Sequence, residues 1–169
     1  MKVWFTTLHH IIGQSLLLFY ILTFNNTFSQ NTKAKEDSLY IRTHYTKMER
    51  MIPMRDGVKL FTSIYVPKAV STGAKYPIML NRTPYSSAPY GDTLYKISLG
   101  PSMLFARDGY IFVYQDVRGK YMSEGDFEAY RPFIPQKKNK TDNDESSDAY
   151  DTIEWLIKNV EGNNGRVGT

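Results

Sequence analysis

The sequence predicts an α/β fold in which an antiparallel hairpin leads into a mostly parallel sheet with flanking helices. Three observations point to this class: continuous apolar runs at residues 78–80 and at residues 110–114 of a second strand at 110–117, a short helix-like segment between them, and a helical pattern at residues 147–160 followed by the start of another strand. Continuous apolar runs are typical of strands buried on both faces of a parallel sheet. Strands that alternate with helices indicate an α/β architecture.

Size and composition fit a single globular domain. The 169 residues are 41% hydrophobic and 22% charged, with a net charge of +4. We expect no nucleic-acid partner, because the longest basic cluster (QKKNK) is followed by the acidic DNDE, whereas nucleic-acid-binding proteins gather Lys and Arg on one face. The chain has no cysteine, which excludes disulfides, thiolate nucleophiles and cysteine-based zinc sites.

Residues 1–29 have the order of a secretory signal peptide: a basic start, an apolar run, and the small residues Thr27 and Ser29 at the exit. A membrane anchor is the alternative, but the run is short for a span of about 20 residues, and Gln14 and Ser15 interrupt it. We therefore expect cleavage after Ser29, no stable membrane anchor, and a secreted or periplasmic protein of bacterial type.

Residues 30–44 are polar and are expected to be flexible, so that the folded domain covers residues 45–169. Two extended runs follow, on either side of Asp56-Gly57. Asp-Gly between β-forming runs is a strong signal for a tight turn. This pattern predicts an antiparallel hairpin.

The stretch YPIMLNRTPY, residues 76–85, predicts a buried strand that ends in a turn. Pro84 constrains the turn, which brings Tyr85 to the carboxyl-terminal edge of the sheet. A phenol at that edge can donate a hydrogen bond to a developing oxyanion. The alternative is a tyrosine that only packs within its loop.

Residues 102–117 predict a short helix, a turn at Asp108-Gly109, and a second buried strand. Asp116 and Arg118 lie near the end of that strand. They are candidates for catalysis, or for a pair that braces a loop by a charge-assisted hydrogen bond.

A polar loop at residues 131–147 precedes a helix at residues 147–160. Acidic residues at its start and Lys158 near its end match the helix dipole. Gly and Asn in EGNNG predict its end, and RVGT starts another parallel strand.

Several familiar chemistries are missing. The sequence contains no G-x-S-x-G and no glycine-rich phosphate loop after a strand. Of three histidines, two lie in the signal segment, and His44 precedes the hairpin without a nucleophile nearby. The acidic stretch from Asp142 fails as a calcium loop, because Ser147 and Ile153 occupy the positions that require Gly and Glu.

Four motifs, in order, resemble those of the X-prolyl dipeptidyl-peptidase-like serine hydrolases, the group that includes cocaine esterase, glutaryl-cephalosporin acylases and α-amino-acid ester hydrolases. They are MRDGVKL, RTPY, QDVRGKYMSEGDF and SDAYDTIEWLIKNVEGNNGRVG, and the resemblance as a whole spans about residues 45–169. The last is most similar to the ester hydrolases. Met122 departs from the pattern, since Gly is common before SEG.

The resemblance implies the N-terminal part of an incomplete α/β-hydrolase domain. In this family the strand begun by RVGT runs into the nucleophile elbow, and Asp and His follow later, so the catalytic triad would lie beyond Thr169. The tyrosine that matches Tyr85 donates its hydroxyl to the oxyanion. The implied substrate is a small-molecule ester or amide of a small acyl group, α-amino acyl groups included, and no cofactor is implied.

Two alternatives stay open. One is an X-prolyl dipeptidyl-peptidase-type peptidase on the same scaffold. The other is a degenerate, non-catalytic binding module that lacks the serine. The sequence leaves the oligomeric state open, a homo-oligomer included.

Overall fold

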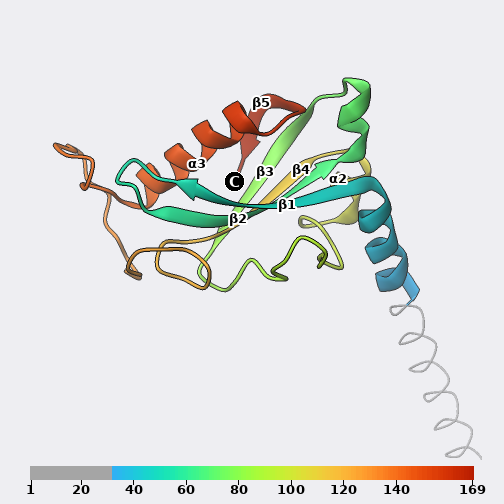
Figure 1. Ribbon diagram of the computed structural model, residues 1–169, viewed down its shortest axis with the longest axis horizontal. Helices are drawn as coiled ribbons and strands as arrows, with labels where there is room; N and C mark the ends of the chain where they lie inside the picture. The colour runs from blue at the N-terminus through green and yellow to red at the C-terminus, as the bar shows by residue number, and fades with distance from the viewer. Residues whose placement is uncertain (1–31) are drawn as a thin grey trace, which may run out of the picture.

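The computed structural model describes residues 32–169, which form a five-stranded sheet with helices on both faces (Figure 1). The order of the strands in the sheet is β1-β2-β4-β3-β5. This arrangement confirms the predicted α/β class, with a hairpin that leads into parallel strands. The predicted signal peptide at residues 1–29 lies outside the described residues.

The hairpin consists of β1 (Tyr45–Pro53) and β2 (Lys59–Pro67), which pair antiparallel along their whole length. The turn is closed by a hydrogen bond from the Met54 N–H to the Val58 carbonyl, at 2.8 Å. Gly57 lies in this turn with φ at 92°, a conformation that a side chain disfavours. The Asp-Gly signal therefore located the turn correctly.

The parallel part contains β3 (Tyr76–Thr83), β4 (Ile111–Asp116) and β5 (Asn163–Gly168). β3 lies between the other two and is parallel to both, whereas β4 joins the hairpin by pairing antiparallel with β2. The two apolar runs that predicted buried strands are β3 and β4.

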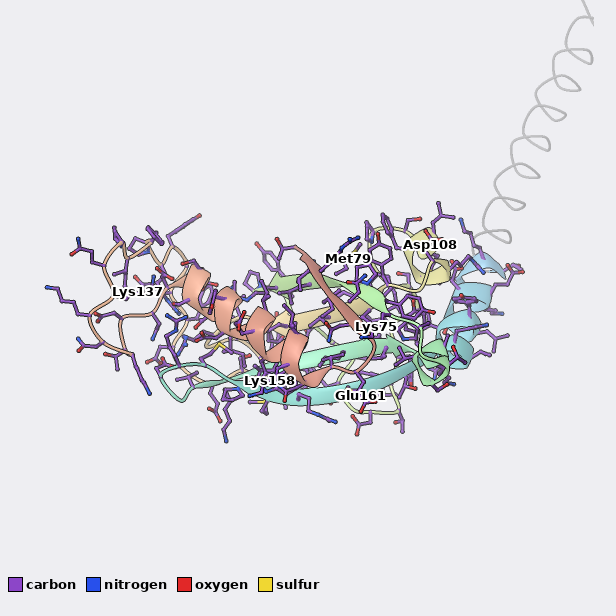
Figure 2. All side chains as sticks on the ribbon, turned by 90° about the horizontal axis from the view of Figure 1, so that it is seen from above. Lys75, Met79, Asp108, Lys137, Lys158 and Glu161 are labelled. Carbon is purple, nitrogen blue, oxygen red and sulfur yellow. The ribbon has the colours of Figure 1, made fainter. Side chains whose placement is uncertain are left out.

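Successive side chains of a β-strand point to opposite faces of the sheet, so the strands contribute to two separate cores. On one face, Ile78, Ile111 and Val113 pack with Leu156 of α3 (Glu145–Asn159). On the other face the core joins residues of the strands to α2 (Met103–Arg107) and to a helix at residues 32–44: Ile41, Tyr45, Tyr65, Leu99, Ala106 and Phe112. In Figure 2, α3 lies across the strands and carries Lys158 near its end, whereas Met79 of β3 packs against the second core.

The predicted helix at residues 147–160 is α3, which begins two residues earlier than expected. Asp144 explains the earlier start. Its carboxylate accepts a hydrogen bond from the Ser147 N–H, and the Ser147 hydroxyl accepts one from the Asp144 N–H. This reciprocal cap satisfies two backbone donors that a helix start otherwise leaves unpaired.

The expectation of a flexible segment at residues 30–44 is corrected for residues 32–44, which are helical. Ile41 is fully buried, and Asp37 forms an ion pair with Arg107 of α2 at 3.3 Å. The segment is mostly polar, so tertiary contacts at a few positions hold it rather than a continuous apolar stripe. Within residues 32–169, no helix has both the length and the apolar character needed to cross a bilayer.

Candidate functional site

The carboxyl ends of β3 and β4 form one edge of the sheet, where the candidate site lies. Thr83 is the register partner of Asp116, and the Val117 N–H donates to the Thr83 carbonyl at 3.2 Å. Because the strands are parallel, the segments that follow them emerge side by side. In such sheets ligands bind outside these carboxyl ends.

Tyr85 follows β3 by two residues at this edge, and its side chain is 85% exposed. Its backbone N–H donates to the Thr83 side-chain oxygen at 3.0 Å. Among the described residues, no hydrogen-bond partner is recorded for its hydroxyl. The phenol is thus free to donate to a ligand, which is the feature the sequence singled out.

The backbone around this exposed ring is firmly held. Ser86 lies in the left-handed region with φ at 86°, which is uncommon for a residue other than glycine. Its hydroxyl contacts the Tyr90 hydroxyl at 2.9 Å and accepts from the Ala88 N–H at 3.1 Å. The next residue, Ser87, donates its N–H to Asp116 at 2.6 Å.

Asp116 is fully buried at the end of β4 and joins two loops. Besides Ser87, its carboxylate accepts from the Tyr90 hydroxyl at 3.0 Å and from the Met122 N–H at 3.3 Å. Burial and this neighbouring carboxylate raise the pKa of Tyr90, so the phenol stays protonated and donates. The loop after β3 and the loop after β4 are therefore tied together by one carboxylate.

Asp116 and Arg118 do not pair with each other, although the sequence suggested them as a bracing pair. Arg118 points to the other face and donates to Asp148 of α3 and to Asp56 in the hairpin turn, at 2.6 and 2.8 Å. Burial alone would lower the pKa of Arg118, but the two carboxylates raise it above its ordinary value. Each residue braces a loop, with partners distant in sequence.

The loop that carries Tyr90 is also fastened by Lys47, a contribution that the sequence analysis missed. The Lys47 side chain is fully buried. Its ammonium group donates to one carboxylate and three backbone carbonyls at 2.7–2.8 Å: those of Glu49, Pro89, Gly91 and Leu94. The strand pattern could have predicted the burial of Lys47, since Lys47 lies on the same face of β1 as the buried Tyr45.

His44 lies away from this edge. The register places Tyr45 opposite Pro67, beyond the amino end of β4, so the start of β1 is at the opposite end of the sheet from Asp116. The His44 ring is exposed and stacks on Tyr40 with ring centres 4.0 Å apart. The exposed ring agrees with the solvated or loosely packed position that the sequence favoured for His44.

A groove of about 670 Å³ lies against the strands on the same face as α2. Its lining is mainly apolar, with Met79 of β3, Phe112 and Tyr114 of β4, and Val167 of β5. Within residues 32–169, no group of three His, Asp or Glu side chains is arranged to hold a metal ion.

The chain is similar to known proteins in both sequence and structure. The sequence profile of X-Pro dipeptidyl-peptidase, the S15 family, matches residues 56–169. Cocaine esterase of Rhodococcus sp. (strain MB1 Bresler) is 34% identical over 120 residues, which are 70% of this chain and 18% of the esterase.

Two solved structures are similar in both sequence and fold. An α-amino acid ester hydrolase is 45% identical with a TM-score of 0.62, and the match covers 74% of this chain and 20% of that one. An aminopeptidase from the marine sediment archaeon Thaumarchaeota archaeon is 46% identical with a TM-score of 0.60, covering 73% of this chain and 20% of the aminopeptidase. The chain thus spans about a fifth of the length of these relatives.

Proposed function

Since the chain belongs to the X-Pro dipeptidyl-peptidase (S15) family, we propose that it forms the N-terminal part of a serine hydrolase of the α/β-hydrolase fold. The proposed enzyme cleaves esters or amides of small acyl groups, α-amino acyl groups included, through an acyl-enzyme. The similarity to an α-amino acid ester hydrolase and to cocaine esterase supports an ester substrate.

The observation that carries the proposal is the placement of Tyr85. Its hydroxyl is exposed at the carboxyl edge of the sheet, while the backbone on both sides of it is held by Thr83 and Asp116. An oxyanion donor must be positioned before the charge develops, because a donor that has to reorganise contributes less to the transition state. Tyr85 combines a free hydroxyl with a fixed backbone, as that role requires.

The register of β5 supports a nucleophile beyond this chain. Gly168 is level with Met79, so Thr169 is level with Leu80, three residues before Thr83 (83 − 80 = 3). In the proposed longer protein, β5 continues by about this length to the edge where Tyr85 lies. A nucleophile elbow at the end of that strand lifts its serine above the sheet, beside the phenol.

A peptidase on the same scaffold is the second candidate, and the similarity to the archaeal aminopeptidase favours it. The two candidates share the serine chemistry and differ in the leaving group. A panel of p-nitrophenyl esters, α-amino acid esters and X-prolyl amides separates them by kcat/KM. A degenerate binding module would hydrolyse none of these substrates.

We also propose that the protein is exported, with residues 1–29 as a cleaved signal and Gln30 as the first mature residue. N-terminal sequencing of the protein from its host tests this. An intact Met1 on membrane-bound protein would favour an anchor instead.

The coding sequence downstream of Thr169 provides the decisive test of the proposed function. We expect β5 to run into the elbow G-x-S-Y-x-G that the resemblance implies, and the purified longer protein to react with a fluorophosphonate at that serine. A downstream sequence with no serine at the elbow, or no fluorophosphonate labelling, would refute the serine hydrolase and leave the binding module.

A further inference from the structure

We infer that Asp116 is a positioning residue for the Tyr85 hydroxyl, acting through the hydrogen-bonded loop at residues 85–90. The inference rests on the proposed function, in which Tyr85 stabilises the oxyanion. Asp116 itself is fully buried, so it contacts the loop and not the substrate.

The backbone of Tyr85 and Ser86 is held at both ends. Before Tyr85, Thr83 pairs with Asp116 across the sheet and accepts from the Tyr85 N–H at 3.0 Å. After Ser86, the Ser87 N–H donates to Asp116 at 2.6 Å. Asp116 is therefore the register partner of one anchor and the hydrogen-bond acceptor of the other.

The direction of each hydrogen bond in the loop follows from the carboxylate. A phenol has one proton, and Tyr90 gives its proton to Asp116. The Tyr90 oxygen must then accept from the Ser86 hydroxyl, whose own oxygen accepts from the Ala88 N–H. Asp116 thereby orients the contacts that hold Ser86 at φ of 86°, a strained conformation that persists only where its surroundings impose it.

Asparagine cannot replace this carboxylate. One carboxylate oxygen of Asp116 faces the Ser87 N–H, and the other faces the Met122 N–H. Backbone donors cannot turn round, so whichever oxygen becomes an amide nitrogen meets an N–H group. Asp116→Asn therefore releases one of the two loops while it leaves the size of the side chain almost unchanged.

The test is a double-mutant cycle in the full-length hydrolase, with Tyr85→Phe, Asp116→Asn and the double variant. Turnover of a p-nitrophenyl ester is normalised to the sites titrated by a fluorophosphonate, which removes any effect of misfolded protein. We expect Asp116→Asn to lower kcat about tenfold with little change in KM, and to lower it by less than about twofold when Tyr85 is already Phe.

Asp151→Asn is the matched control. Asp151 also accepts a hydrogen bond from a backbone N–H, that of Arg55 at 2.9 Å, and both of its carboxylate oxygens are hydrogen-bonded. It lies on α3 without contact to the Tyr85 loop. We expect near-normal kcat for it. If Asp116→Asn does not fold, Tyr90→Phe removes one donor from the carboxylate, and we expect a loss of about threefold in kcat with the same dependence on Tyr85.

The outcomes separate the two claims. Unchanged kcat in Tyr85→Phe would overturn the proposed oxyanion role itself. A large loss in Tyr85→Phe, together with an equal loss from Asp116→Asn in both backgrounds, would keep that role and overturn the positioning by Asp116. An equal loss from Asp151→Asn would reduce Asp116 to a general contributor to stability.

Discussion

Arg118 binds Asp148 through two nitrogens, at 3.0 and 2.6 Å, with the side chains only 5% and 1% exposed. The same guanidinium reaches Asp56 at 2.8 Å, and Arg131 approaches Asp148 at 3.4 Å. This buried ionic cluster joins the hairpin turn, the loop after β4 and the start of α3.

Arg118→Leu should strongly destabilise the protein. Removing Arg118 takes away the nearest cation from the buried carboxylates of Asp56 and Asp148, and breaking a buried pair in this way typically costs about 3–5 kcal/mol. Denaturant unfolding measures the change. Arg50→Leu is the control, since Arg50 is exposed on the same hairpin and should change stability by less than about 0.5 kcal/mol. Equal midpoints for the two variants would contradict a structural role for the cluster.

Tyr85→Phe in the full-length enzyme should lower kcat roughly a hundred- to a thousand-fold, the usual effect of losing one oxyanion donor. KM should change little, because the ground-state carbonyl is not yet an oxyanion. The melting temperature should stay constant, since the ring is 85% exposed and contributes little packing. A lowered melting point with normal turnover would instead identify a packing residue.

Acidification should weaken the start of α3 through Asp144. Burial would raise the pKa of this carboxyl, but hydrogen bonds from Ile134, Lys137, Ser146 and Ser147 hold it below its ordinary value. A depressed folded-state pKa stabilises the protein above the unfolded value of about 3.9, and this contribution is lost as the pH falls through the folded-state pKa.

Asp144→Asn isolates this contribution, because Asn caps helices about as well as Asp but cannot ionise. The variant should melt at a lower temperature than the wild type near pH 7, and the difference should shrink below about pH 4. Melting temperatures measured from pH 7 to pH 2.5 provide the check. A difference that is constant over this range would rule out the ionised carboxylate as the source.

Residues 1–169 by themselves should show no serine-dependent hydrolysis. Tyr85 is an oxyanion donor in the proposal and not a nucleophile, and without nucleophile and base at most a small residual rate remains. The purified chain is assayed with p-nitrophenyl esters before and after a fluorophosphonate. Turnover that the fluorophosphonate blocks would show that a nucleophile lies within this chain.

The same chain should bind dyes that report exposed apolar surface. The groove on the α2 face exposes parts of Met79, Tyr114 and Val167, and β5 is an edge of the sheet among residues 32–169. Open edges and apolar patches favour association. Dye fluorescence and light scattering measure this. A monomer with a sharp cooperative melt and no dye binding would be the contrary result.

Local sequence was enough to identify the five strands, α2 and α3, and their order. Neighbouring residues are enough to show the apolar runs of β3 and β4, the Asp-Gly turn and the helical spacing of α3. Burial on one or two faces imposes a repeat of apolar residues that can be seen in the local sequence. The motif order also identified the family. The helix at residues 32–44 was missed, since its few buried positions are defined by partners far along the chain.

Tertiary structure decided which polar groups meet. Asp116 and Arg118 are two residues apart, yet the first binds the loop after β3 and the second binds α3 and the hairpin turn. Sequence spacing would place residues two apart on one face of a strand, but β4 ends at Asp116, so the path of the chain after the strand decides where Arg118 points. The sequence by itself therefore determined the fold class and the candidate Tyr85, whereas the fold decided what holds that tyrosine in place.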